Sequence, residues 1–273
     1  LISPRVNADW YNFAATSEAQ RAARGGYYPS ADIYAEAGRE DRNTPLIDLG
    51  DYGRDSTEFS ITQMLFDGFA TRDTVARLGY DKLSNYYIFK RSSEEVALEV
   101  AVAYLETVKY QQLVKYAEDN LKVHRQIHDQ ISERTGGGVS EGVDLDQAVA
   151  RVGLAETNLV TETTNLRDVE VQFQRLVGSY PNANLEVPAV PVGQIPQMRG
   201  AALEVAYQNS PVINAAIENL RAAQESLNLT NAPFMPRFDL RYRNQVEHDT
   251  DGIDGKFEEE AIEVVMKYNL FRG

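Results

Sequence analysis

The chain has 273 residues, no cysteine and a formal net charge of −14, from 41 acidic against 27 basic side chains. Without cysteine it can form neither a disulfide nor a thiolate metal site. Its negative charge repels a phosphate backbone, so nucleic acid is not an expected partner. No run of 18 apolar residues occurs, so the sequence predicts no transmembrane helix.

The two ends of the chain are related by a repeat. SPRVNA at 3–8 returns as SPVINA at 210–215, and the same offset of 207 residues brings Pro29 onto Pro236. A period of this size exceeds that of solenoid repeats and indicates duplication of a whole structural unit.

The repeat continues through LFDG at 65–68, which is answered by LFRG at 270–273. After LFDG the first copy runs on into a long helical stretch. We therefore expect the chain to hold one complete unit and the opening of a second.

The first copy predicts a helix followed by two strands. Residues 4–24 are rich in alanine and free of internal proline, which favours a helix. Residues 30–40 and 58–66 alternate apolar with polar side chains, which is typical of strands, and a polar stretch separates them.

A long antiparallel helical hairpin follows. Residues 70–133 lack proline and predict a helix of about 96 Å. Its distal part has apolar residues at heptad spacing, and so does the return helix after the bend TGGGVSEG at 135–142, with Glu162 as the exception in the second seam. The seam residues are Val96, Val100, Ala103, Thr107, Tyr110, Val114, Ala117, Leu121, His124, His128 and Ile131, then Leu145, Ala148, Val152, Ala155, Leu159, Glu162, Leu166, Val169, Phe173 and Leu176.

Prolines at intervals in residues 180–197 predict a connector without helix or central strand. The second copy then predicts a helix at 211–230 and strands at 237–247 and 259–271.

The sequence thus predicts an α+β fold in four parts. They are a first repeat, a long α-hairpin, an equatorial connector and a second repeat without its hairpin, at 1–68, 69–178, 179–200 and 201–273.

The strands fit either a half-buried soluble sheet or a transmembrane barrel, whose strands need about 9 to 11 residues. Tyr27, Tyr28 and Phe234 lie at the expected helix-to-strand junctions, where interfacial side chains of a barrel belong, and favour the barrel. Four strands cannot close a barrel around a lumen, so several chains must combine. The lipid-facing residues of the second hairpin are then Phe238, Leu240, Tyr242, Ile262 and Val264.

The chain resembles the TolC-like outer-membrane channels, and is most similar to the branch that serves type I secretion. The resemblance covers essentially the whole chain and rests on three motifs. They are AR-x-x-YYP at 23–29, QMLFDG at 63–68, and the hairpin bend with Arg134, Gly138, Asp144, Leu145 and Ala148.

The resemblance implies a homotrimer in the outer membrane of a Gram-negative bacterium. Three chains would form a 12-stranded β-barrel in the lipid bilayer, continued by a periplasmic α-helical barrel of 12 helices, with a belt at the connector. Family members also have a helix before the segment at 3–8 and a second long hairpin after the segment at 270–273, which carries the acidic ring and much of the gate. Neither gate nor ring can be assigned in this chain.

The resemblance also places the docking site of a periplasmic adaptor protein at the hairpin tip. The matching residues are Arg134, Gly137, Gly138, Val139, Ser140 and Asp144. The glycines also fit a flexible turn that needs positive φ, and both interpretations can hold.

Two other clusters favour ordinary structural roles. His124 and His128, four residues apart, could be two metal ligands, but a zinc site needs three or four, so we interpret them as seam residues. Asp249, Asp251 and Asp254 could hold calcium, but their spacing departs from an EF-hand loop, so we interpret them as a solvated turn. No metal or cofactor is expected.

The sequence predicts a passive outer-membrane channel of a type I secretion or tripartite efflux system, driven by an inner-membrane ABC transporter or another pump. The alternative is a periplasmic adaptor, which also uses a long α-hairpin but does not explain the duplicated helix-strand-strand unit. An enzyme on a coiled-coil scaffold is a third interpretation. No catalytic constellation can be argued from spacing in a chain with three histidines.

Overall fold

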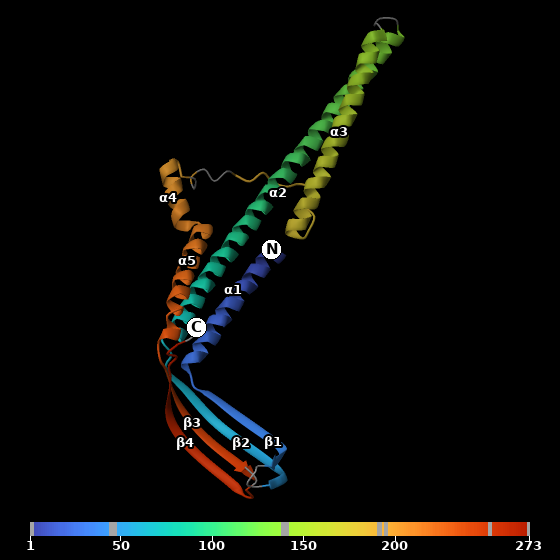
Figure 1. The fold of residues 1–273 in the computed structure, drawn as a ribbon. Helices are drawn as coiled ribbons and strands as arrows, with labels where there is room; N and C mark the ends of the chain where they lie inside the picture. The colour runs from blue at the N-terminus through green and yellow to red at the C-terminus, as the bar shows by residue number, and fades with distance from the viewer. Residues whose placement is uncertain are drawn as a thin grey trace. The chain divides into compact units, whose positions relative to one another are not determined.

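The computed structural model describes residues 3–43, 48–137, 142–189, 193, 196–250 and 253–271 (Figure 1). The chain divides into two compact units, Leu1–Trp10 with Ile88–Pro211, and Tyr11–Tyr87 with Val212–Gly273. Helices α1 (Pro4–Ala23) and α2 (Ala70–Gly136) each contribute to both units. In the described ranges, no helix combines the length and the apolar character needed to cross a membrane.

The second unit contains an antiparallel sheet of four strands in the order β1-β2-β3-β4 (Figure 1). The strands are β1 (Ser30–Asn43), β2 (Asp48–Phe66), β3 (Arg237–His248) and β4 (Lys256–Lys267). Each repeat contributes one hairpin, and β2 joins β3 with Ile61 opposite Tyr242. The two outer strands, β1 and β4, each keep one open edge.

The two predicted helix-strand-strand modules are confirmed. In the first, α1 leads through the 3-10 turn η1 (Arg24–Tyr27) into β1, and in the second α5 (Pro211–Leu229) leads through η3 (Ala232–Phe234) into β3. The prolines of the repeat, Pro29 and Pro236, each lie directly before the strand, where the missing N–H costs no ladder bond.

The predicted strand boundaries were partly wrong. β2 begins at Asp48 rather than 58 and β1 continues to Asn43, because the polar stretch between them pairs as a ladder despite its lack of apolar alternation. β4 covers 256–267 rather than 259–271. Its last residue, Lys267, lies opposite Arg237, the first residue of β3, and Pro236 before it cannot donate a further ladder bond.

The corner between β2 and α2 is sharply bent. Gly68 and Phe69 both have φ of 70°, in the left-handed region. A Cβ on Gly68 would lie 2.7 Å from the carbonyl oxygen of Ala232 and 2.9 Å from the Cβ of Met235, so the corner packs directly on the second repeat. Only glycine fits this position without displacement.

The carboxylate of Asp67 caps the start of α2. Its Oδ2 accepts hydrogen bonds from the backbone N–H of Thr71 at 2.8 Å and from the Thr71 hydroxyl at 2.6 Å. A free donor of the first helical turn is thereby satisfied.

Within the second unit, α1 packs against the first turns of α2. Phe13 and Tyr86 have ring centroids 5.7 Å apart, and the Gln20 amide donates to the Val75 carbonyl at 3.3 Å. Gly79 allows this approach, because a Cβ there would lie 2.7 Å from Gln20 Nε2.

In the first unit, α2 and α3 (Gly142–Val177) form the predicted helical hairpin (Figure 1). Every predicted seam position is buried or half-buried, with Ala103, Thr107 and Ala155 among the least exposed side chains. Arg125 on α2 bridges to Glu156 on α3 at 2.7 Å. The 3.5-residue period therefore identified the contact faces of both helices.

The connector after α3 contacts the first unit's part of α2. Gly178, with φ of 88°, ends α3 by donating to the Gln174 carbonyl at 2.7 Å. The Tyr104 hydroxyl then donates to the Glu186 carbonyl at 2.8 Å, and the Gln111 amide donates to the Asn182 carbonyl at 3.0 Å.

A helix that was not predicted from the sequence, α4 (Arg199–Asn209), precedes Ser210. Ser210 is extended, with ψ of 116°, because the residue before a proline avoids the helical region.

Candidate functional site

The sheet has one apolar and one polar face. The register places Ile33, Phe59 and Asn244 in one row across β1, β2 and β3, and Ala31, Ile61, Tyr242 and Ile262 in the next row across all four strands. Because side chains alternate along a strand, these residues share a face. All five residues predicted to face lipid, Phe238, Leu240, Tyr242, Ile262 and Val264, lie on it.

The apolar face is largely uncovered in the single chain. The exposed fractions of Ile33, Ile262 and Val264 are 75%, 75% and 63%. A contiguous apolar surface of this kind marks contact with a partner or a membrane.

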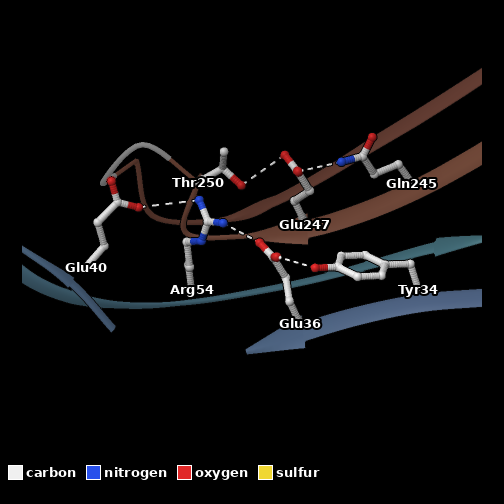
Figure 2. A network of polar contacts seen from close by, with 7 residues as sticks. All are labelled: Tyr34, Glu36, Glu40, Arg54, Gln245, Glu247 and Thr250. Atoms are coloured by element: carbon white, nitrogen blue, oxygen red, sulfur yellow. Dashed lines mark hydrogen bonds and ion pairs between the residues drawn. The ribbon is translucent and has the colours of Figure 1, made fainter. Parts of the chain in front are cut away.

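The opposite face has charged side chains joined by ion pairs. Arg54 on β2 contacts Glu36 and Glu40 on β1, as Figure 2 shows. On the other hairpin, Arg243 contacts Glu259 at 2.6 Å and Arg241 contacts Glu263 at 3.8 Å, from β3 to β4. In these pairs the arginines lie on the two central strands and their carboxylate partners lie on the two outer strands.

Further hydrogen bonds extend this polar network. The Tyr34 hydroxyl donates to Glu36 at 3.0 Å, the Gln245 amide donates to Glu247 at 2.6 Å, and the Thr250 hydroxyl donates to Glu247 at 3.1 Å (Figure 2). The polar face therefore presents mainly charged and hydrogen-bonding groups and is suited to contact with water.

Aromatic side chains surround the ends of the strands that lie next to the helices. Tyr28 and Phe234 are 71% and 78% exposed. Phe69, held in a left-handed conformation, stacks edge-on against Phe66 at 5.2 Å, and the guanidinium of Arg72 lies 4.2 Å from the Phe69 ring centroid. A hydrogen bond to Asp73 raises the pKa of Arg72. The guanidinium of an arginine is charged at physiological pH in any case, so the cation–π contact is available there.

The structure describes part of the predicted docking tip. Arg134 lies in the last turn of α2, Gly137 directly follows that helix, and Asp144 lies in the first turn of α3. Gly138, Val139 and Ser140 lie outside the described residues. Arg134 and Asp144 come together as walls of one cavity of about 180 Å³. The other lining residues are His124, Ile127, Ile131, Gln147, Ala148 and Arg151.

Two features of functional interest escaped the sequence analysis. Val143, next to the bend, is 72% exposed and adds an apolar side chain to the tip. The pair of Phe69 and Arg72 was missed because its geometry depends on the unusual φ of Phe69. An aromatic residue and an arginine three positions apart at a helix start could have signalled it.

The histidine and aspartate clusters show local contacts. His128 Nδ1 lies 3.1 Å from Asp129 Oδ1, and both His124 and His128 are half-buried at the seam. Asp249 Oδ1 accepts from the Gly255 N–H at 2.9 Å, within the turn that follows β3, while Asp251 lies outside the described residues. Among the residues that can be described, no three His, Cys, Asp or Glu side chains converge on a possible metal position.

A family model described as outer membrane efflux protein matches residues 2–179. A curated relative, the outer membrane efflux protein BepC of Brucella suis biovar 1 (strain 1330), is 25% identical over 191 residues, which cover 67% of this chain and 41% of BepC. The chain thus spans less than half of BepC. This match and the family model do not support the alternative of a periplasmic adaptor.

Solved outer-membrane channels share the fold. CusC superposes with a TM-score of 0.84 at 14% identity, over 99% of this chain and 63% of the CusC chain. VceC from Vibrio cholerae superposes with a TM-score of 0.78 at 16% identity, over 99% of this chain and 66% of the VceC chain. The TolC-like fold, mostly helical with an antiparallel sheet, is therefore confirmed.

Proposed function

The chain belongs to the outer membrane efflux protein family, whose place is the outer membrane with an extension into the periplasm, and we propose that it builds a trimeric, passive export channel. The observation that carries this proposal is the two-faced sheet. Its apolar face suits lipid, and its ion-paired face suits a water-filled lumen. An antiparallel sheet of four strands can supply one third of a 12-stranded barrel.

A second apolar stripe on α2 supports the assembly. Leu98, Val102 and Leu105 repeat at the spacing of a heptad seam but lie away from the seam with α3, and they are 66%, 48% and 49% exposed. A helix in a helical barrel has a neighbour on both sides and needs two such stripes. We assign this one to a helix of the trimer that lies outside the single hairpin.

Two consecutive valines on β4 test the orientation of the sheet. Val264 lies on the apolar face opposite Leu240, whereas Val265 lies on the polar face opposite Asp239. Val264→Arg should place a charge in lipid, at a cost of about 2–4 kcal/mol near the midplane, and should reduce membrane insertion. Val265→Arg, next to a carboxylate in the lumen, should insert normally. Equal insertion of both variants would contradict the proposal.

We also propose that the hairpin tip docks a periplasmic adaptor. The cavity walls of Arg134 and Asp144 offer both charges for recognition, and Val143 adds an exposed apolar side chain beside them. The adaptor would connect the channel to an inner-membrane ABC transporter or another pump, in type I secretion or tripartite efflux. Energy then comes from the pump, and the channel itself stays passive.

Gly138→Trp tests the docking site by steric block. We expect trimers to assemble and insert, while transport per inserted trimer falls and crosslinking from position 139 to the adaptor is lost. Gly153→Trp is the matched control, because Gly153 lies on α3 with open space around its Cβ position, away from the bend. Unchanged transport per trimer for Gly138→Trp would exclude docking at the tip. A loss of abundance in step with activity would indicate a purely structural turn.

A further inference from the structure

The open edges of β1 and β4 determine how one copy of the sheet can join the next. Consecutive strands are antiparallel, so β4 of one copy can also pair in an antiparallel ladder with β1 of the next copy. The inference below rests on the proposed trimeric channel and identifies the residues that lie opposite each other at that junction.

The apolar band on the outward face runs obliquely across the sheet. Its margin is the first charged residue on each strand, or a histidine on β3: Glu260 on β4, His248 on β3, Asp55 on β2 and Arg39 on β1. The sheet register shows how these margin residues are offset from strand to strand. On β4, Glu260 lies opposite Asn244, which is four residues before His248 on β3, and His248 lies directly opposite Asp55 on β2. On β1, Arg39 lies two residues beyond Ala37, the partner of Asp55. From β4 to β1 the margin therefore moves by four, zero and two residues, a mean of two residues per strand.

This shift gives the tilt of the strands in the membrane. A mean shift of about two residues, each rising about 3.4 Å, over a strand spacing of about 4.8 Å inclines the band by roughly 55° to the perpendicular of the strands. A bilayer requires a level band, so the strands tilt from the membrane normal by a similar angle, about 10° above the value of about 45° for membrane strands.

We propose that the same shift continues across the junction, so that Arg39 of one copy lies opposite Ile262 of the next copy. Ala37 then lies opposite Val264, and Ala35 lies opposite Met266. The apolar margins of both copies then meet at one height in the bilayer, and the charged margin residue of β1, Arg39, lies next to the last apolar residue of β4, Ile262.

The segment after β4 supports this register. Apolar alternation continues past Lys267 to Tyr268 and Leu270, which are 50% and 86% exposed and have no partner on β3. In the proposed register these two residues lie opposite Ile33 and Ala31 of the neighbouring copy. The strand would thus extend to residue 271 in the assembly, which explains why the sequence predicted a longer strand than the single chain contains.

The charges on the lumen face support it independently. Glu36 and Glu40 on the edge of β1 would lie opposite Val265 and Ala261. A slip of two residues that moves Arg39 opposite Glu260 would instead place Glu36 opposite Glu263 and Glu40 opposite Glu259. Like charges directly opposite each other destabilise a sheet.

A slip in the other direction is also unfavourable. It would move Arg39 opposite Val264, inside the apolar band, and Glu40 opposite Glu263. In the proposed register one like-charged pair remains, Asp41 with Glu260, on the outward face beyond the apolar margin. Salt and water screen charges at that position more than charges in the band.

Disulfide crosslinking tests the register in the full-length channel, with any cysteine outside these 273 residues replaced; the 273 residues themselves contain none. Ala37→Cys is combined in turn with Val264→Cys, Ile262→Cys and Met266→Cys, one pair for the proposed register and one for each slip. Two strands separate position 37 from these positions within a chain, so a crosslink forms only between copies. Directly opposite residues are about 4.5–5.5 Å apart at Cα, within disulfide reach, while diagonal ones are about 7–8 Å apart.

We expect the 37/264 pair to give covalently linked copies in several-fold higher yield than the other two pairs. Dominant linkage of 37/262 or 37/266 would overturn the register and leave the barrel intact. No linkage of any pair, in membranes where an amine-reactive reagent still captures trimers, would exclude pairing of β1 with β4. Absence of trimers with that reagent, for the cysteine-free protein, would refute the proposed function and the register together. Ala35→Cys with Met266→Cys tests the same register if the first pair does not fold.

Discussion

Gly68 should be one of the least replaceable residues in the second unit. Its φ of 70° costs a side chain about 1 kcal/mol, and the added Cβ of Gly68→Ala would meet the Ala232 carbonyl oxygen at 2.7 Å and the Met235 Cβ at 2.9 Å. These contacts are with a backbone oxygen and a Cβ atom, which cannot move away by rotation of a side chain. Relief therefore requires movement of η3, at a cost of about 1–3 kcal/mol. We therefore expect the free energy of unfolding to fall by about 3 kcal/mol.

Gly178→Ala separates the two contributions. Gly178 has φ of 88° but no atom within 4 Å of its Cβ position, so the substitution should cost only the conformational strain of about 1 kcal/mol. Denaturant titration of both variants, followed by circular dichroism in lipid vesicles, gives the two values. If Gly68→Ala is no more destabilising than Gly178→Ala, the corner after β2 does not pack on the second repeat as described.

Substitutions at three further sites test other parts of the account. Asp67→Ala removes the cap of Thr71 and should destabilise the protein by about 1 kcal/mol in the same titration, and Asp67→Asn, which keeps one acceptor, should cost less. Val102→Asp should lower the yield of trimers on native gels without changing the helix content of the monomer, because Val102 is 48% exposed in one copy. An unchanged yield of trimers would argue against the second apolar stripe on α2. Gly153→Ala, on α3 with open space around it, should stabilise the hairpin by about 1 kcal/mol, and a loss of stability would show that the glycine serves a close approach.

Apart from α4, the α-helices of this chain could be predicted from sequence because their signals are local. The seams through Ala103 and Ala155 follow a sustained 3.5-residue period, and the repeat carried the helix-strand-strand order from the first copy to the second. Periodicity did not identify the first half of β2, Asp48 to Thr57, which has glycines and aspartates and is held as a strand by its pairing with β1.

The corner after β2 depended on contacts that no local pattern contains. The LFDG motif indicated a repeated strand end, but the need for Gly68 arises from Ala232 and Met235, which come from the other repeat. The exposed positions of Phe69 and Arg72 follow from the same bend. By contrast, the face of Leu240 and Val264 was predictable, because alternation alone fixes which residues share a side of a strand.

The most direct test of the channel is a cysteine scan of β4 in the assembled protein, with a water-soluble thiol reagent. Single cysteines at positions 261 to 266 are introduced one at a time into the cysteine-free chain and labelled in outer membranes. The account predicts labelling with a period of two: Ala261, Glu263 and Val265 positions react from the lumen, whereas Ile262, Val264 and Met266 positions are shielded by lipid. Equal labelling at consecutive positions, or reaction of the Val264 position and protection of the Val265 position, would contradict it.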